Sequence, residues 1–391
     1  MKGLLSCLLL SICVISSGKE IQENTTSNNP VSDDFKSYKL DIKADKVKIT
    51  ELIASVEFVR LEESKESLLP NPRQIFLHND MIVFNTAKGD DIFFFDQQGN
   101  FLHKINRAGD GPEEYKRISQ LWLEDNMISI YSWWLGTIKN YDLKGNFISS
   151  SRLPNDMAQM GHFMPYNDSY VLETNFSMLN DSSRYKLVML DKNFKPIQKH
   201  LPFKPAIKNE RHPHYPGALP MEPYHDGLLL LRSHSDTVYY LRGNELKPLI
   251  HFDYGDNWFW KGQEHITQDG FVEIETAPVP KAWEITADVG DKQIYTKAVM
   301  GISHWEHFLI DRQSGKSIHL DLRKDAENEY ELIPLQWQGD EMLWSIASPD
   351  ALELMENLSA DKIKYRKGTS SEIISSSENP VLMWVTFKNN K

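Results

Sequence analysis

Short apolar runs, each followed by a polar turn, recur along the chain at a spacing of 46 residues. Met81–Phe84 aligns with Met127–Ile130, and Ile92–Leu102 aligns without a gap with Ile138–Ile148. Both longer copies contain an aromatic residue, an aspartate, two variable residues, Gly-Asn-Phe and an aliphatic residue. A repeat of this length is typical of solenoids, propellers and other arrays.

The repeat unit has the pattern of a β-hairpin that follows an earlier strand. The apolar run ending at Phe95 predicts a strand, and Phe101 begins the return strand. Between them, Asp96 can accept hydrogen bonds from the turn backbone, and Gly99 can adopt a positive φ. Three or four short strands in each repeat match the size of one propeller blade.

Weaker copies of the unit follow at 186–197, 237–246 and 307–316. A last apolar strand, Val381–Phe387, is predicted to pair with the early strand Val56–Leu61, because a ring closed by both chain ends leaves no long free edge. The prediction is an all-β fold, a six-bladed β-propeller over residues 36–391. A β-solenoid is the alternative, and the irregular spacing of the later copies argues against it.

One helix is expected between the late strands. Ser348 is the expected N-cap, Pro349 the first helical residue and Asp350 an acid in the first turn. Residues 351–358 continue with helical spacing. The helix would be an insertion before the closing strand.

The N-terminus has the pattern of an export signal over residues 1–18. Lys2 precedes the apolar stretch Leu4–Ile15, which is too short to span a bilayer, and small residues follow it. Residues 19–35 are polar and predict a flexible tether. No later apolar run is long enough to cross a membrane. A buried N-terminal strand or helix is the alternative.

Both cysteines, Cys7 and Cys13, lie within this expected signal. A chain cleaved after Gly18 has no disulfide, so its stability would depend on its core. Cys13 is alternatively a lipid-modified first residue, because Leu10–Cys13 resembles a bacterial lipobox, with Ile12 at the position where a small residue is expected. We expect the protein outside the cytoplasm, in the periplasm or at the outer membrane, with any membrane attachment made only by such a lipid.

Composition narrows the range of partners. The chain has 391 residues, 40% of them hydrophobic, and a formal net charge of −12. An acidic protein lacks the basic face that phosphate binding needs, so nucleic acid is not expected as a partner. A small molecule, a glycan or a protein remains a suitable partner for what we expect to be a monomer.

Four stretches resemble the six-bladed β-propeller proteins abundant in gut Bacteroidetes, many of them described as lipoproteins. They are 48–62, 95–115, 235–239 and 379–382. Gly109–Tyr115 is similar to the family's Gly-x-Gly-Pro-Gly-Glu-Tyr loop, with Glu113 in place of the third glycine. The resemblance implies a funnel-like propeller outside the cytoplasm, often encoded beside nutrient-uptake systems. That family has no established catalytic residues, so none is carried over.

Several loop residues are candidates for ligand binding. Tryptophans in loops suit sugar or peptide stacking, and the alternative is that they pack between blades. His212 and His214 have a spacing that could hold a metal, but nothing completes a recognised metal site, and solvated loop histidines are more common. Arg107 could lie at the mouth of a channel. The candidate ligand-binding residues are Arg107, Trp133, Trp134, His212, His214, Trp258 and Trp260.

The sequence contains no recognised catalytic motif. Gly109–Tyr115 lacks the Lys-Ser/Thr pair and following helix of a phosphate-binding loop, and neither Gly-x-Ser-x-Gly nor His-Glu-x-x-His occurs. No cofactor and no bound metal are expected. The favoured hypothesis is a non-catalytic binding module at the cell envelope, linked to nutrient or glycan uptake. The alternative is a hydrolase or lyase that uses the central channel, which rests on analogy of fold alone.

Overall fold

The computed structural model describes residues 34–69, 72–86, 90–155, 157, 161–174, 185–202, 220–261, 268–301 and 304–388. The chain divides into two units, Met1–Ser32 and Asp33–Lys391, and all of these residues belong to the second. The expected signal peptide, Cys13 and almost all of the expected tether therefore lie outside the described residues.

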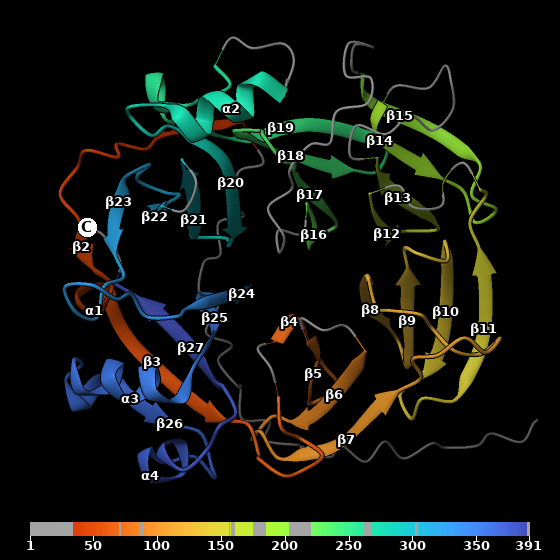
Figure 1. Cartoon of the computed structure of the whole chain (residues 1–391), viewed down its shortest axis with the longest axis horizontal. Helices are drawn as coiled ribbons and strands as arrows, with labels where there is room; N and C mark the ends of the chain where they lie inside the picture. The colour runs from red at the N-terminus through yellow and green to blue at the C-terminus, as the bar shows by residue number, and fades with distance from the viewer. Residues whose placement is uncertain are drawn as a thin grey trace, which may run out of the picture. The chain divides into compact units, whose positions relative to one another are not determined.

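The described strands form six sheets arranged around a centre, which confirms the six-bladed β-propeller (Figure 1). Blades 1 to 3 have four strands each. Blade 1 contains β4 (Pro72–His78), β5 (Met81–Thr86), β6 (Asp91–Asp96) and β7 (Phe101–Asn106). Blade 2 contains β8 (Gln120–Glu124), β9 (Met127–Ser132), β10 (Thr137–Asp142) and β11 (Phe147–Arg152). Blade 3 contains β12 (His162–Tyr166), β13 (Ser169–Glu173), β14 (Tyr185–Leu190) and β15 (Pro196–Pro202).

Blades 4 to 6 have five strands each, because segments from the chain ends join them. Blade 4 contains β16 (Met221–Tyr224), β17 (Gly227–Leu231), β18 (Thr237–Arg242), β19 (Glu245–Asp253) and β1 (Lys36–Lys39). Blade 5 contains β20 (Ala282–Val289), β21 (Gln293–Met300), β22 (His304–Asp311), β23 (Ser317–Asp321) and β2 (Val47–Lys48). Blade 6 contains β24 (Ile333–Gln338), β25 (Glu341–Ile346), β27 (Val381–Phe387), β3 (Ile53–Arg60) and β26 (Ile363–Tyr365).

The turn chemistry expected for the repeat is present in blade 1. The Asp96 carboxylate accepts hydrogen bonds from the backbone N–H groups of Gln98 and Asn100, at 2.9 and 2.8 Å. Gly99 has a φ of +79°. The carbonyl oxygen of Gly99 accepts a hydrogen bond from the backbone N–H of Glu62, just after β3, at 2.8 Å. The turn of blade 1 therefore docks onto blade 6, where the ring closes.

The innermost strand of each blade is the inner edge of its sheet, and the prolines in several of these strands are consistent with that position. Proline cannot donate a ladder hydrogen bond, so it is confined to sheet edges. Pro165, Pro223 and Pro334 lie in the inner strands β12, β16 and β24. Glutamine side chains join neighbouring inner strands: Gln74 accepts from the Leu121 backbone N–H at 3.2 Å, and Gln120 accepts from that of Phe163 at 2.5 Å.

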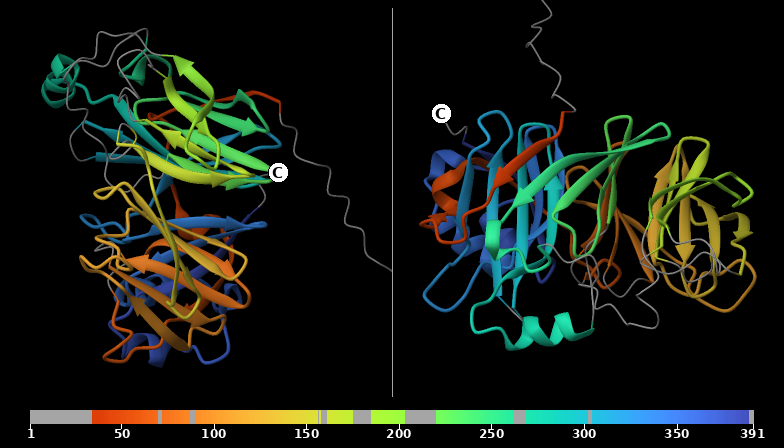
Figure 2. Two further views of the ribbon diagram at one scale, coloured as in Figure 1. Left: turned by 90° about the vertical axis from the view of Figure 1, so that its right-hand side faces the viewer. Right: turned by 90° about the horizontal axis from the view of Figure 1, so that it is seen from above.

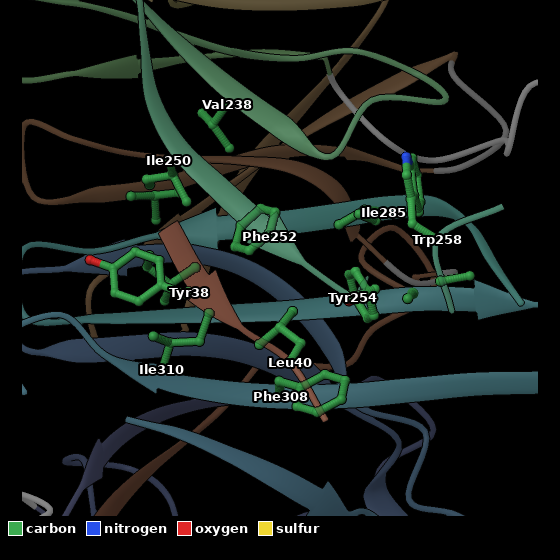
Figure 3. Close-up of a cluster of buried hydrophobic side chains, with 14 of the residues drawn as sticks. Tyr38, Leu40, Val238, Ile250, Phe252, Tyr254, Trp258, Ile285, Phe308 and Ile310 are labelled. Carbon is green, nitrogen blue, oxygen red and sulfur yellow. The ribbon is translucent and has the colours of Figure 1, made fainter. Parts of the chain in front are cut away.

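The N-terminal segment 34–48 runs along the outer edges of two blades before it enters blade 6. β1 pairs in parallel with β19, and β2 pairs in parallel with β23. Tyr38 and Leu40 are 2% exposed and pack in the hydrophobic core shared by blades 4 and 5, beside Phe252 (Figure 3). Lys46 forms an ion pair with Glu306 of β22 at 2.7 Å. We call this segment the strap.

Blade 6 closes the ring as expected, because β27 pairs antiparallel with β3 over Val381–Phe387 and Ile53–Arg60. A buried asparagine, Asn379, fixes the entry to β27. Its side-chain amide donates to the carbonyl oxygens of Glu62 and Ser67 at 3.0 and 2.9 Å, and its side-chain oxygen accepts from the Leu69 backbone N–H at 2.8 Å. Both the nitrogen and the oxygen of the buried Asn379 side-chain amide are thus hydrogen-bonded across the junction of the two chain ends.

The expected late helix is present as α3 (Ser348–Glu356), but its N-cap is Ala347, not Ser348. The Ser348 hydroxyl instead donates to the carbonyl oxygen of Asn379 at 2.7 Å, so it holds the helix onto the closing strand. Sequence analysis did not identify three further helices among the described residues. They are α1 (Ile49–Leu52), α2 (Gln268–Thr276) and α4 (Ser371–Ser375).

Removal of residues 381–391 should destabilise the whole propeller, because β27 lies between β25 and β3 and its loss exposes an edge on each. We expect the chain ending at Pro380 to be insoluble, or to melt at least about 10 °C lower, by circular dichroism. A chain ending at Lys388 keeps β27 and is the control. An unchanged melting temperature for the shorter chain would contradict a structural role for closure.

Gly99→Ala should cost more stability than Gly243→Ala, although both glycines have positive φ. Each substitution carries a backbone cost of roughly 1–2 kcal/mol. A Cβ on Gly99 would lie 1.8 Å from the carbonyl oxygen of Arg60, whereas a Cβ on Gly243 meets nothing within 4 Å. Chemical denaturation should show at least about 1 kcal/mol more destabilisation for Gly99→Ala. Equal losses of stability for the two variants would mean that the backbone at the contact between blades 1 and 6 can shift at no cost in free energy.

Candidate functional site

The six inner strands surround the propeller axis (Figure 1), and residues from them line a channel there. The cavity in this channel has a volume of about 1220 Å³, and every inner strand contributes residues to its wall. Because the inner strands are sheet edges, side chains and unpaired backbone groups face the cavity. The channel is therefore the candidate site.

The two faces of the propeller carry different connections. Successive strands within a blade are antiparallel, so their connections alternate between faces. One face has short turns such as Asn79–Asp80 and Asp142–Asn146, and we call it the short-turn face. The other, the long-connection face, has the links between blades, including the link that contains α2. Figure 2 (right) shows α2 on one side and the start of β1 on the other.

A pair of carboxyl groups from neighbouring blades faces the channel. Glu222 lies on β16 and Asp288 on β20, and both side chains line the cavity. Burial and the nearby Asp288 charge raise the pKa of Glu222 to about 8, although the Val289 backbone N–H donates to its carboxylate. Burial also raises the pKa of Asp288 to about 6, and the Lys297 charge opposes that rise. At neutral pH, Glu222 therefore carries a proton and Asp288 is mostly ionised.

Lys297 of β21 supplies the positive charge of this group and also lines the cavity. Burial lowers the pKa of its ammonium group, while Asp288 raises it. The ammonium lies 4.7 Å from the centre of the Trp305 ring, which favours the charged form. Burial lowers the pKa of the nearby His307 to about 3, so this histidine is neutral. Its Nδ1 lies 2.8 Å from the Tyr295 hydroxyl.

A second polar cluster forms where β13, β17 and β20 meet. Arg232 and Glu173 form a buried ion pair at 3.1 Å. Glu284 accepts a hydrogen bond from the His234 backbone N–H at 3.0 Å, and burial raises its pKa to about 8. The His234 ring lies 5.2 Å from Trp260, centre to centre. Glu173 and Glu284 both reach the channel wall.

A family model described as a domain of unknown function, DUF4934, matches residues 37–386. The chain belongs to the DUF4934 family. That match covers all six blades. A search of the curated proteins finds no match to this chain.

The solved structures that are similar to this DUF4934 chain have low sequence identity to it. A Bacteroides fragilis NCTC 9343 protein named "putative exported protein" is 14% identical, with a TM-score of 0.69, and the alignment covers 90% of this chain and 100% of that one. A duf4221 family member from Bacteroides vulgatus is 11% identical, with a TM-score of 0.48 and coverage of 85% and 98%. Virginiamycin B lyase from Staphylococcus aureus is 12% identical, with a TM-score of 0.38 and coverage of 75% and 84%. The last two structural similarities are too weak to indicate a fold or a function for this chain.

The candidate tryptophans of this DUF4934 propeller fall into two groups. Trp134 is 55% exposed in the turn between β9 and β10, and its ring contacts the half-buried Trp133 at 4.8 Å between centres. Trp258 and Trp260 are only 5% and 6% exposed. The Trp260 indole donates to the Trp283 carbonyl oxygen at 2.7 Å. The structure thus places this second pair in the core of blades 4 and 5, as the alternative interpretation expected.

Arg107 is not among the described residues that line the channel. Its guanidinium Nε donates to the Gly145 carbonyl oxygen at 3.2 Å, and its own carbonyl oxygen accepts from the Tyr115 backbone N–H at 3.0 Å. Tyr115 is fully buried, so the Gly109–Tyr115 loop is a tight link between blades 1 and 2.

His212 and His214 lie outside the described residues. Within the described parts of the chain, no group of three or more His, Cys, Asp and Glu side chains is placed to hold a metal ion. In the same parts, no helix is both long and apolar enough to cross a membrane.

Glu222, Asp288 and Lys297 were not among the residues predicted from the sequence. A usable signal existed for Lys297, because it is the only charged residue in the strand Gln293–Met300. Glu222 gave a weaker signal, as a carboxylate beside a proline in a strand of four residues. Their proximity depends on the packing of blade 4 against blade 5, which local patterns do not reveal.

Glu222→Gln should change how stability depends on pH. The folded-state pKa of Glu222, about 8, exceeds its ordinary value of 4.5, so its ionisation disfavours the folded state as pH rises from 4.5 through 8. We therefore expect the variant to gain stability over the wild type at pH 8.5 but not at pH 4, in denaturant titrations. Glutamine cannot ionise, so the gain should follow the titration.

Glu306→Gln is a matched control with the opposite sign. Burial opposes ionisation of Glu306, but hydrogen bonds from His319, Lys46 and His304 lower its pKa to about 2. Its contribution is present above pH 4.5 and is lost as pH falls towards 2. This variant should be less stable than the wild type at pH 7, with a smaller difference at pH 3. Equal pH profiles for both variants would contradict the assigned environments.

Proposed function

We propose that this DUF4934 propeller is a non-catalytic binding protein outside the cytoplasm, with its ligand held in the central channel. The observation that carries the proposal is the cavity of about 1220 Å³, lined by donors and acceptors from separate blades. This volume exceeds the roughly 300–1,000 Å³ typical of small-molecule sites, so it suits a small molecule of several linked units.

The chemistry of the wall suits a ligand rich in hydroxyl groups, such as a short glycan. Protonated Glu222 can donate a hydrogen bond, ionised Asp288 can accept one, and Lys297 can donate. Trp337 also lines the cavity, and its indole nitrogen donates to the backbone oxygen of Asp288 at 2.8 Å. Donors, acceptors and an aromatic ring together match both the edges and the apolar faces of a sugar.

Location and attachment are part of the same proposal. The export pattern of residues 1–18 and the name of the similar Bacteroides fragilis protein support a place at the cell envelope. A lipid on Cys13 would be the only attachment to a membrane. The protein acts as a monomer that binds a ligand or a partner protein.

The Glu222–Asp288 pair favours one second function, acid–base catalysis in the channel. Two carboxyl groups with different pKa values are the usual requirement for an acid and a base at one site. Turnover of glycans or lactones that Glu222→Gln abolishes, with binding retained, would establish this function instead of simple binding.

The test of binding is a panel of oligosaccharides screened by thermal shift and then by calorimetry. Lys297→Met should weaken the affinity for the ligand about tenfold, or about 1.4 kcal/mol, because it removes a hydrogen-bond donor from the cavity wall. Lys316→Met is the control, since Lys316 is exposed in an outer turn of the same blade. No binding by any glycan, or equal effects of the two variants, would refute a glycan site in the channel.

A further inference from the structure

The outer edges of the six blades are treated in two ways. In blades 4, 5 and 6 a short fifth strand, β1, β2 or β26, pairs in parallel with the strand that would otherwise be outermost. In blades 1, 2 and 3, the outermost strands β7, β11 and β15 have no strand on their outer side among the described residues. These three blades are consecutive, so their uncapped edges form one side of the ring (Figure 1).

The short fifth strands β1, β2 and β26, which we call caps, share a pattern of charge. Lys39 of β1 pairs with Asp253, Lys48 of β2 with Asp321, and Lys364 of β26 with Glu57. Each cap thus places a lysine directly opposite an acidic residue of the strand that it covers, and no cap contains an acid. Opposite charges at directly paired positions stabilise a sheet, whereas like charges destabilise it.

The uncapped strands carry the opposite charge. None of β7, β11 and β15 contains an acidic residue, and they contain Lys104, Arg152 and Lys199 respectively. In a chain with a net charge of −12 this absence of acids is a local feature. A cap with lysines, like those of blades 4 to 6, would meet like charge here. An acidic strand would meet opposite charge.

The uncapped strands also share a backbone feature. Each has a β-bulge near its start, and the residue left out of register is an exposed aliphatic. These residues are Leu102, Ile148 and Ile197, which are 47%, 54% and 56% exposed. Bulges can protect an edge, but exposed aliphatic side chains do not.

In blade 4, a strand edge that follows a bulge already accepts a strand. In β19 the register also shifts, at Leu249, and β1 pairs with the four regular residues that follow, Ile250–Asp253. In β11 the bulge at Ile148 is followed by the regular residues Ser149–Arg152, all of them exposed. β11 therefore offers a free edge of the same length, four residues, after its bulge.

We propose that β11 is a docking edge for an extended, acidic segment of a partner protein, which adds as a parallel fifth strand along Ser149–Arg152. Its main-chain groups would continue the ladder as β1 does in blade 4, an apolar side chain would cover Ile148, and a carboxylate would lie near Arg152. Lys144, exposed in the turn before β11, adds a second positive charge. β7 and β15 share the bulge, the exposed aliphatic residue and the absence of acids.

The probe is a fluorescent peptide based on the chain's own cap, residues 34–42, with Lys36→Glu and Lys39→Glu. The same peptide with its natural lysines is the control, since it differs only in charge. Fluorescence anisotropy with the purified protein should show binding of the acidic peptide at least tenfold tighter than that of the control. The double variant Lys144→Glu/Arg152→Glu should bind the acidic peptide at least tenfold more weakly than the unchanged protein does.

Lys316→Glu is the matched variant, because Lys316 is exposed in the corresponding turn of the capped blade 5, and it should leave binding unchanged. Hydrogen exchange should show new protection of the amides of residues 149–152, which charge attraction alone would not produce. Equal binding of the two peptides, no effect of the double variant, or no protection in β11 would each overturn the proposal. So would self-association through this edge, seen by sedimentation, or binding to anionic vesicles with no protection.

Discussion

Closure of the ring is the constraint on which the rest of the structure depends. Each blade contacts only its neighbours, so without a junction between blades 6 and 1 the array would end in two open faces. The junction combines the β27–β3 pairing, the Asn379 hydrogen bonds and the docking of the blade 1 turn onto Arg60. None of these contacts is covalent. A domain whose two cysteines both precede its first strand is closed entirely by hydrogen bonds and packing.

Closure also creates the channel and determines its chemistry. A sheet edge that faces the ring centre tolerates proline and presents unpaired groups, which is why polar side chains accumulate there while the blade interfaces are apolar. The Glu222–Asp288–Lys297 group lies where this polar centre meets the packed interface of blades 4 to 6. Its perturbed pKa values follow from that position, because each side chain is partly removed from water and only partly neutralised by its neighbours.

The fold was predictable from local signals, and the site was not. The aspartate and glycine of the 46-residue repeat define a turn by themselves, and the alternation in Val381–Phe387 defines a closing strand. Loop tryptophans, in contrast, look alike whether exposed, as Trp134 is, or buried, as Trp260 is. The pairing of Lys39 with Asp253 joins residues more than 200 positions apart, and no single-sequence pattern reveals it.

The strap has a consequence for the order in which the chain can fold. β1, β2 and β3 are made first, but their partners end at Asp253, Asp321 and Phe387. A chain that emerges from its N-terminus therefore cannot pair β1 before residue 253, β2 before residue 321 or β3 with β27 before residue 387 has been delivered. Such long-range pairing makes folding slow. The same topology that stabilises the finished ring delays its completion, and it leaves the first strands of the chain without their partners until later parts of the chain are present.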